Sequence, residues 1–210
     1  MPVFTKNKKS ILFIHIPKCA GSSFERAMKV DGWSEYFSIR GVGLTDMSWS
    51  KVSPQHFHAE LLQQCFEPKK FEAIVTIVRE PFKRLVSEYF WQLKQGITIL
   101  EPNSWLDDVF LKYETNKLIY DNHIRPQSEF ILPETKIFKL EENGVIDAVN
   151  FVRQSCIQQN FFLLNAIGKL LLYKKEKKTR YDQSQIYKFE CRKVEIIDFY
   201  QIDYMRLGYD

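Results

Sequence analysis

Three short runs of apolar residues, rich in β-branched and aromatic side chains, stand out along the chain. They extend from Ser10 to Ile16, from Phe71 to Val78 and from Thr135 to Leu140. Pro17 closes the first run, and an Arg-Glu pair and Pro81 follow the second. Runs of this length that end at turn-forming residues are typical of buried strands. We therefore expect a strand at each of these positions.

The residues after the first two runs have the spacing of helices that bury one face. Phe24, Ala27 and Met28 recur at intervals of three and four after the first run. Pro81 suits the first turn of the second helix, because the N–H groups there have no intrahelical partner. The apolar stripe of that second helix ends at Gly96 and consists of Leu85, Val86, Tyr89, Phe90 and Leu93.

Further helical patterns cover residues 103–121, 143–155, 160–171 and the long stretch from Ser184 to Tyr204. Residues 31–58 show no clear period. The chain thus runs twice from a strand through a turn into a helix, which implies a parallel sheet with helices on its faces. Of the 210 residues, 45% are hydrophobic, and we find no repeat or low-complexity linker. We predict one α/β domain over residues 1–210.

Charge and cysteine usage narrow the class of protein only slightly. The net charge of +4 suits an anionic ligand but is too small to indicate nucleic-acid binding. The four cysteines form no Cys-x-x-Cys pair, so we interpret them as reduced thiols of a cytoplasmic protein. Two disulfides in a secreted chain are the alternative. The run "ILFIHI" is too short for a signal peptide, and no stretch reaches the ~20 apolar residues that span a membrane.

The turn after the first predicted strand has the composition of a phosphate-binding loop. The N-terminus of a helix attracts anions, and Gly21 allows a phosphate to approach the backbone closely. Ser22 and Ser23 add hydroxyl donors, and Lys18 adds a positive charge. Lys18 precedes the glycine, whereas in Gly-x4-Gly-Lys-Ser/Thr loops the lysine follows it. The alternative is a plain turn in which Ser22 or Ser23 only caps the helix.

The second strand–turn–helix unit carries an arginine and a serine at corresponding places. Arg79 ends the strand and can grip a phosphate with two hydrogen bonds, while Ser87 lies in the following helix. Ligands of parallel α/β sheets bind beyond the carboxyl ends of the strands, so both motifs point to one ligand with two phosphate groups. The alternative is that Arg79 pairs with Glu80 or Glu88, and that Ser87 only faces a helix.

Both motifs resemble those of sulfotransferases that use 3′-phosphoadenosine 5′-phosphosulfate (PAPS), in particular the carbohydrate sulfotransferase group. "FIHIPKCAGSSF" is similar to that group's 5′-phosphosulfate motif, and "VREPFKRLVSEY" to its 3′-phosphate motif. Further resemblances follow in the expected order: "DNHIRPQSEFI" near the acceptor site, "KIFKLEE", "KKEKKTRYD" in a basic loop over the donor, and "YQIDYMRLGYD". The resemblance implies a central parallel sheet flanked by helices, related to P-loop nucleotide kinases. It also implies a PAPS donor, the product 3′-phosphoadenosine 5′-phosphate (PAP), and no metal requirement.

The resemblance also implies roles for individual residues. Lys18 would neutralise the leaving oxygen. The 5′-phosphosulfate would be held by Lys18, Cys19, Ala20, Gly21, Ser22 and Ser23, and the 3′-phosphate by Arg79 and Ser87. Arg84 matches the pattern as a structural residue, and Lys178 or Lys177 with Arg180 would cover the donor, unless this basic run is a solvated loop. Because the family has Thr or Cys at the position of Cys19, we do not interpret this cysteine as a nucleophile.

The base that removes the acceptor proton is expected to be a histidine, which titrates near neutral pH. "SPQHFHAELL" resembles the segment that carries the base in uronyl 2-O-sulfotransferases, so His56 is the first choice and His58 the second. Glu25 is a poor candidate by comparison. His15 would orient the first loop, and His123 would contact the acceptor or end a helix. A zinc site at His56 and His58 lacks evident further ligands.

The acceptor is expected to be a hydroxyl of a saccharide, a glycolipid or a small metabolite. Residues 31–58 and 95–105 would shape its site. Glycan-sulfating relatives are usually anchored Golgi proteins, so this compact chain suggests a bacterial-type cytoplasmic enzyme, or an excised lumenal domain of a Golgi-type enzyme. The sequence leaves two other functions open: a kinase or NTPase of related fold, and a non-catalytic nucleotide- or glycan-binding relative. It does not predict the oligomeric state.

Overall fold

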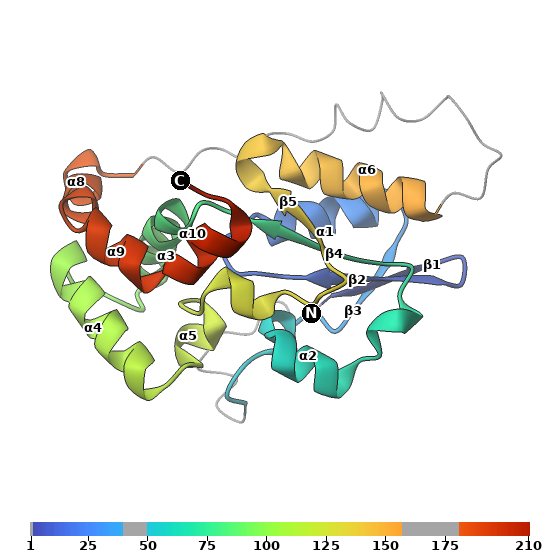
Figure 1. The fold of residues 1–210 in the computed structure, drawn as a ribbon, viewed down its shortest axis with the longest axis horizontal. Coiled ribbons are helices and arrows are strands. Elements are labelled where there is room, and N and C mark those ends of the chain that lie inside the picture. The colour runs from blue at the N-terminus through green and yellow to red at the C-terminus, as the bar shows by residue number, and fades with distance from the viewer. Residues whose placement is uncertain (1, 40–49, 157–180) are drawn as a thin grey trace.

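A five-stranded mixed sheet forms the centre of the protein in a computed structural model that describes residues 2–39, 50–156 and 181–210 (Figure 1). The strand order is β3-β1-β2-β4-β5. The strands are β1 (Val3–Lys6), β2 (Lys9–Ile14), β3 (Ser34–Tyr36), β4 (Ala73–Val78) and β5 (Lys136–Lys139). The three predicted strands correspond to β2, β4 and β5, which are parallel. The predicted α/β class, with parallel strands flanked by helices, is therefore confirmed.

Two further strands, β1 and β3, make the sheet mixed, and the sequence analysis missed both. β1 pairs antiparallel with β2 and with β3. The hairpin from β1 to β2 turns at Asn7 and Lys8, whose φ angles of 50° and 63° are both left-handed. Two left-handed residues in a two-residue loop match the twist of a hairpin. β3 was missed because it has only three residues and an exposed edge position.

Three predicted helices occur where expected, as α1 (Gly21–Val30), α3 (Pro81–Gln95) and α6 (Gly144–Cys156). The predicted helix over 103–121 is instead α4 (Pro102–Thr115) and the short α5 (Ile119–Asn122), because Asn116 is extended and ends α4; within α5, Tyr120 and Asp121 are left-handed. The predicted helix from Ser184 to Tyr204 is broken at Arg192 and Tyr200 into three, which are α8 (Gln183–Cys191), α9 (Lys193–Phe199) and α10 (Gln201–Leu207). α2 (Ala59–Cys65) was not predicted, and the helix predicted at 160–171 lies outside the described residues.

Helices cover both faces of the sheet (Figure 1). Alternate strand residues, among them Phe13 and Ile77, pack with Phe24 of α1 and Val149 of α6 on one face. The neighbouring strand residues pack on the other face with α2 and α10, in a cluster that includes Leu12, Ile14, Leu62, Phe130 and Leu207. A parallel sheet covered on both faces requires nearly continuous apolar strands, which is the pattern of the sequence.

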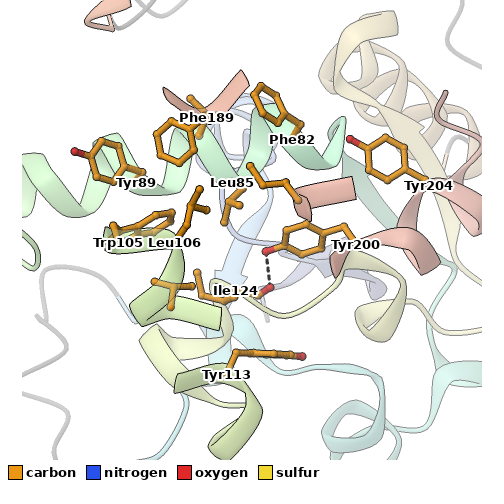
Figure 2. Packing of buried hydrophobic residues seen from close by; sticks show 13 residues of the cluster. Phe82, Leu85, Tyr89, Trp105, Leu106, Tyr113, Ile124, Phe189, Tyr200 and Tyr204 are labelled. Carbon is orange, nitrogen blue, oxygen red and sulfur yellow. Dashed lines mark hydrogen bonds between the residues drawn. The ribbon is translucent and has the colours of Figure 1, made fainter. Parts of the chain in front are cut away.

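A third cluster joins α3, α4, α8, α9 and α10 on one side of the sheet, at the left of Figure 1. Figure 2 shows how Tyr89, Trp105 and Phe189 pack in it, and how the hydroxyl of Tyr200 donates to the carbonyl of Ile124 at 2.8 Å. Buried aromatic residues with a polar tip usually satisfy that tip with such a bond. The cluster thereby anchors the segment after α5 to the C-terminal helices.

Within the described residues, no helix combines the length and the apolarity that crossing a bilayer demands. Cys19, Cys65, Cys156 and Cys191 are all free thiols.

Candidate functional site

A cleft of about 1010 Å³ opens beyond the carboxyl ends of β2 and β4. Its lining includes residues from both predicted phosphate motifs: Lys18, Ala20, Gly21, Ser22, Ser23, Arg79 and Ser87. Its volume lies at the upper end of the roughly 300–1,000 Å³ of small-molecule sites. The two motifs, about sixty residues apart in the sequence, therefore face one cavity that has room for a nucleotide-sized ligand.

The first loop turns sharply into α1. Lys18 and Ala20 are left-handed, with φ angles of 65° and 61°. Ala20 is the N-cap and makes no side-chain cap, so the expectation that Ser22 or Ser23 caps the helix is wrong. The left-handed turn starts the helix at Gly21 and places both serines in its first turn, where they line the cleft. The first-turn N–H groups of a helix have no intrahelical acceptor, which suits this end of the cleft to an anion.

His15 explains why a glycine begins α1. A Cβ atom on Gly21 would lie 2.6 Å from the His15 ring, too close for any other residue. The His15 ring is itself oriented by Glu25, whose carboxylate lies 2.5 Å from its Nδ1 atom. Glu25 is buried. Glu25 thus holds the His15 ring against the start of α1, and the orienting role of His15 stays a prediction.

The ammonium group of Lys18 is partly shielded from solvent. Its ammonium lies 5.1 Å from the centre of the Trp91 ring, within the range of a cation–π contact. Burial lowers the pKa of Lys18; the carboxylate of Glu88 opposes this shift and the charge of Arg79 adds to it. A lysine in this setting interacts more strongly with an anion than a lysine in bulk water does.

Arg79 does not pair with either of the carboxylates proposed as its alternative partners. Glu80 caps α3 by accepting from the N–H groups of Phe82 and Lys83. Glu88 is bonded to His123 and Gln92. Among the described residues, the hydrogen bond of the Arg79 guanidinium is a long one of 3.4 Å to the Lys18 carbonyl. Its donors therefore face the cleft with capacity for an anion.

Arg84 and Cys19 belong to the support of the cleft rather than to its lining. Arg84 is buried and donates to the carbonyls of Pro17 at 3.1 Å and His123 at 2.7 Å. Cys19 is buried and its thiol donates to the Gln127 side-chain oxygen at 3.2 Å. Burial raises the pKa of Cys19 to about 12, so the thiol is neutral and unreactive. Lys177, Lys178 and Arg180 lie outside the described residues.

His56 lines the cleft, and its ring is hydrogen-bonded to the carboxylate of Asp121. Its Nδ1 atom donates to Asp121 at 2.7 Å, and Asp121 also accepts from the backbone N–H and the hydroxyl of Ser53 at 2.5 and 2.8 Å. Burial lowers the pKa of His56 to about 3, although the bond to Asp121 opposes this shift. Burial raises the pKa of Asp121, but the bonds from His56 and Ser53 outweigh it and the net shift is downward. The pair is therefore a neutral imidazole on an ionised carboxylate, and within the described residues Nε2 has no hydrogen-bond partner.

A left-handed turn, which the sequence analysis did not single out, places Asp121. Tyr120, Asp121 and Asn122 have φ angles of 48°, 57° and 64°. Asn122 donates to the carbonyl of His56 at 2.9 Å and bonds to Nδ1 of His58 at 3.2 Å. Asp and Asn tolerate this conformation better than other residues, so the Asp-Asn pair was the one available signal. Strained backbone of this kind is concentrated at functional sites.

The two candidate bases differ in their position. Among the described residues, His56 lines the cleft and His58 does not. His58 precedes α2 as its N-cap residue. The cleft lining also includes Gln95, Gly96 and Ile97 from the segment expected at the acceptor, and Tyr181, which stacks on Phe90 at 4.4 Å between ring centres.

Three histidine rings line the cleft close to one another, and each is bonded to a carboxylate, of which Glu25 and Glu88 are buried and Asp121 is half-buried. The ring of His56 lies 5.2 Å from that of His15 and 4.9 Å from that of His123, between ring centres. His123 bonds to the fully buried Glu88 at 2.8 Å. In the described residues, His56, Asp121 and His123 could offer a metal ligand atoms within 4.8 Å of one another. Asp121 in this group already accepts hydrogen bonds from Ser53 and His56.

Comparison with known proteins gives one match. A family model described as the sulfotransferase family matches residues 1–210. No curated protein and no solved structure matches the chain.

Proposed function

The chain belongs to the sulfotransferase family, and from this premise we propose that it transfers the sulfuryl group of PAPS to a hydroxyl of a saccharide or glycolipid. The observation that carries the proposal is that one cleft holds two cationic strand-end loops and a neutral His56 bonded to the ionised Asp121. We propose residues 1–210 as one sulfotransferase domain acting in the cytoplasm.

The cleft residues fit an anion with two phosphate groups. Lys18, the first turn of α1, Ser22 and Ser23 would hold the 5′-phosphosulfate, and Arg79 with Ser87 would hold the 3′-phosphate. The donor supplies an activated sulfuryl group and a phosphate that can leave. The backbone of Cys19 follows the same loop, while its side chain supports the loop from the interior.

The two chemical demands of the reaction fall on different residues. As the acceptor oxygen bonds to sulfur, its proton must leave and negative charge grows on the departing phosphate oxygen. Burial makes His56 a weaker base than a free imidazole, but the proton of an oxygen that has begun to bond to sulfur is far more acidic than that of a free hydroxyl. His56 would therefore accept this proton at Nε2, and Asp121 would stabilise the imidazolium formed. Lys18 would neutralise the departing oxygen, by an electrostatic contribution that is already in place before the reaction.

Direct assay of transfer tests the proposed function. Purified protein is incubated with labelled PAPS, a panel of polysaccharides and glycolipids, and a chelator, and PAP binding is measured by calorimetry. We expect PAP binding and labelled product without added metal. Absence of PAP binding would sink the proposal. ATP turnover that depends on Mg²⁺ would favour a kinase or NTPase, and tight PAP binding without transfer to any acceptor would favour a non-catalytic relative.

Replacing Asp121 with Asn should lower kcat roughly tenfold to a hundredfold, part of the 10²–10⁴ contributed by a general base. An amide cannot stabilise the imidazolium and does not favour the same ring tautomer. Steady-state kinetics with saturating PAPS measures the change. Asp198→Asn, at an exposed position of α9, is the matched control and should leave kcat unchanged. An unaltered kcat in Asp121→Asn would exclude the pair as the base.

A further inference from the structure

One buried amide joins the two loops that form the cleft. The side chain of Gln127 is fully buried, and its Oε1 atom accepts from the Arg79 backbone N–H at 2.9 Å. The same oxygen accepts from the Cys19 thiol at 3.2 Å, and Nε2 donates to the Arg79 carbonyl at 2.7 Å. Gln127 thus contacts both loops, which are 48 and 108 residues away from it in the sequence.

Asp203 of α10 fixes the backbone from which this amide extends. Its carboxylate is fully buried and accepts from the N–H of Gln127 at 2.7 Å and from the N–H of Ser128 at 2.8 Å. Bonds to a carboxylate are stronger than bonds between neutral groups. α10 therefore fixes the backbone position from which the Gln127 side chain extends to the two loops.

Arg84 ties the same region together at a second point. It connects the Pro17 carbonyl, beside Lys18, to the His123 carbonyl, close to Gln127 in the chain. The hydrogen bonds of Gln127 and Arg84 therefore hold the backbone of Arg79 and the two residues next to Lys18, which are Pro17 and Cys19. The direction of both cationic side chains consequently depends on this interior framework.

We propose that Gln127 is a positioning residue for the donor, which sets the separation of Lys18 and Arg79 so that one nucleotide engages both. The inference rests on the proposed function and deepens it. The resemblance placed the segment of Gln127 near the acceptor, whereas its side chain contacts the two donor loops. Displacements of about 1 Å at such a site cost on the order of a hundredfold in rate, so a rigid link between the loops has a large effect on donor use.

Gln127→Met tests the inference, because methionine has a similar length and volume but forms neither bond to Arg79. We expect the PAP dissociation constant and the KM for PAPS to rise about tenfold or more, while the KM for the acceptor stays within twofold. A role limited to stability would lower the melting temperature and leave the KM of both substrates unchanged. The matched control is Gln64→Met at an exposed position of α2, which should behave as the wild type.

A second variant keeps the test decisive if Gln127→Met does not fold. Gln127→Asn retains an amide in the interior but is one methylene too short to reach both loops, and it should show the same donor-selective defect. Values within twofold of the wild type for PAP and PAPS, or equal rises in the KM of donor and acceptor, would overturn the inference. A wild-type protein that binds no PAP would instead refute the proposed function, so the two failures are distinguishable.

Discussion

Replacing Lys18 with Met should lower kcat by about 10²–10³-fold, the usual loss when a preorganised charge or donor at a developing oxyanion is removed. The ammonium lies over Trp91 in the cleft and its pKa is lowered by burial, so no solvent charge easily substitutes for it. Methionine keeps the apolar stem and removes only the charge. Single-turnover measurement with PAPS and an active acceptor separates this effect on the chemical step from donor binding.

The control for Lys18 is Lys83→Met, which removes an exposed lysine from the first turn of α3. It changes the net charge equally and should leave kcat unchanged. A Lys18→Met rate within threefold of the wild type would show that the leaving oxygen is neutralised by another group. In that case Arg79, which also lines the cleft and carries a positive charge, becomes the residue to replace.

Replacing His56 with Gln should lower kcat by about 10²–10⁴-fold, the range attributed to general acid–base catalysis. Glutamine can still bond to Asp121 but cannot accept a proton at neutral pH. His58→Gln is the matched comparison, because His58 is bonded to Asn122 and lies outside the cleft lining. It should change stability more than kcat. Loss of activity in His58→Gln with an active His56→Gln would reverse the assignment of the base.

The His56→Gln substitution should also change how the free energy of unfolding depends on pH. The pKa of His56 is lowered by burial from 6.5 to about 3, so between these values the unfolded chain binds more protons than the folded protein. Stability must then rise with pH across this window and be lost as the pH falls from about 6.5 toward 3. Urea unfolding gives the free energy of unfolding at pH 6.5 and at pH 4.5. The decrease between the two pH values should be smaller in His56→Gln than in the wild type by on the order of 1–2 kcal/mol. Equal losses in both proteins would contradict a neutral, buried His56.

Local patterns predicted the parts of the fold that depend on neighbouring residues. The apolar runs ending at Pro17 and before Arg79 form β2 and β4, and the stripes after them form α1 and α3. The prediction was wrong where periodicity continued through a break. Apolar spacing alone did not reveal the extended Asn116 that ends α4 or the left-handed residues at Tyr120 and Asp121, because such backbone satisfies tertiary contacts rather than a local preference.

The candidate site was predictable to the extent that its residues follow strands. Lys18, Ser22, Ser23, Arg79 and Ser87 line the cleft because the carboxyl ends of adjacent parallel strands must meet at one edge. Asp121 and Gln127 were missed as site residues. Neither carries a spacing that relates it to the loops it contacts, and a lone Asp or Gln is usually a surface residue.

By itself, the sequence determined two strand–turn–helix units and a lysine ahead of its glycine, and hence the prediction of a phosphate-binding edge that differs from an ATP loop. These features depend on the period of apolar residues and on turn chemistry, which act over a few residues. Only the tertiary structure distinguishes the surroundings of His56 from those of His58, by bringing Asp121 from 65 residues away to the first of them. It also decided that Cys19 faces inward onto Gln127, 108 residues away. Such contacts are set by how helices pack around the sheet, since a buried polar group must find its partner wherever packing places one.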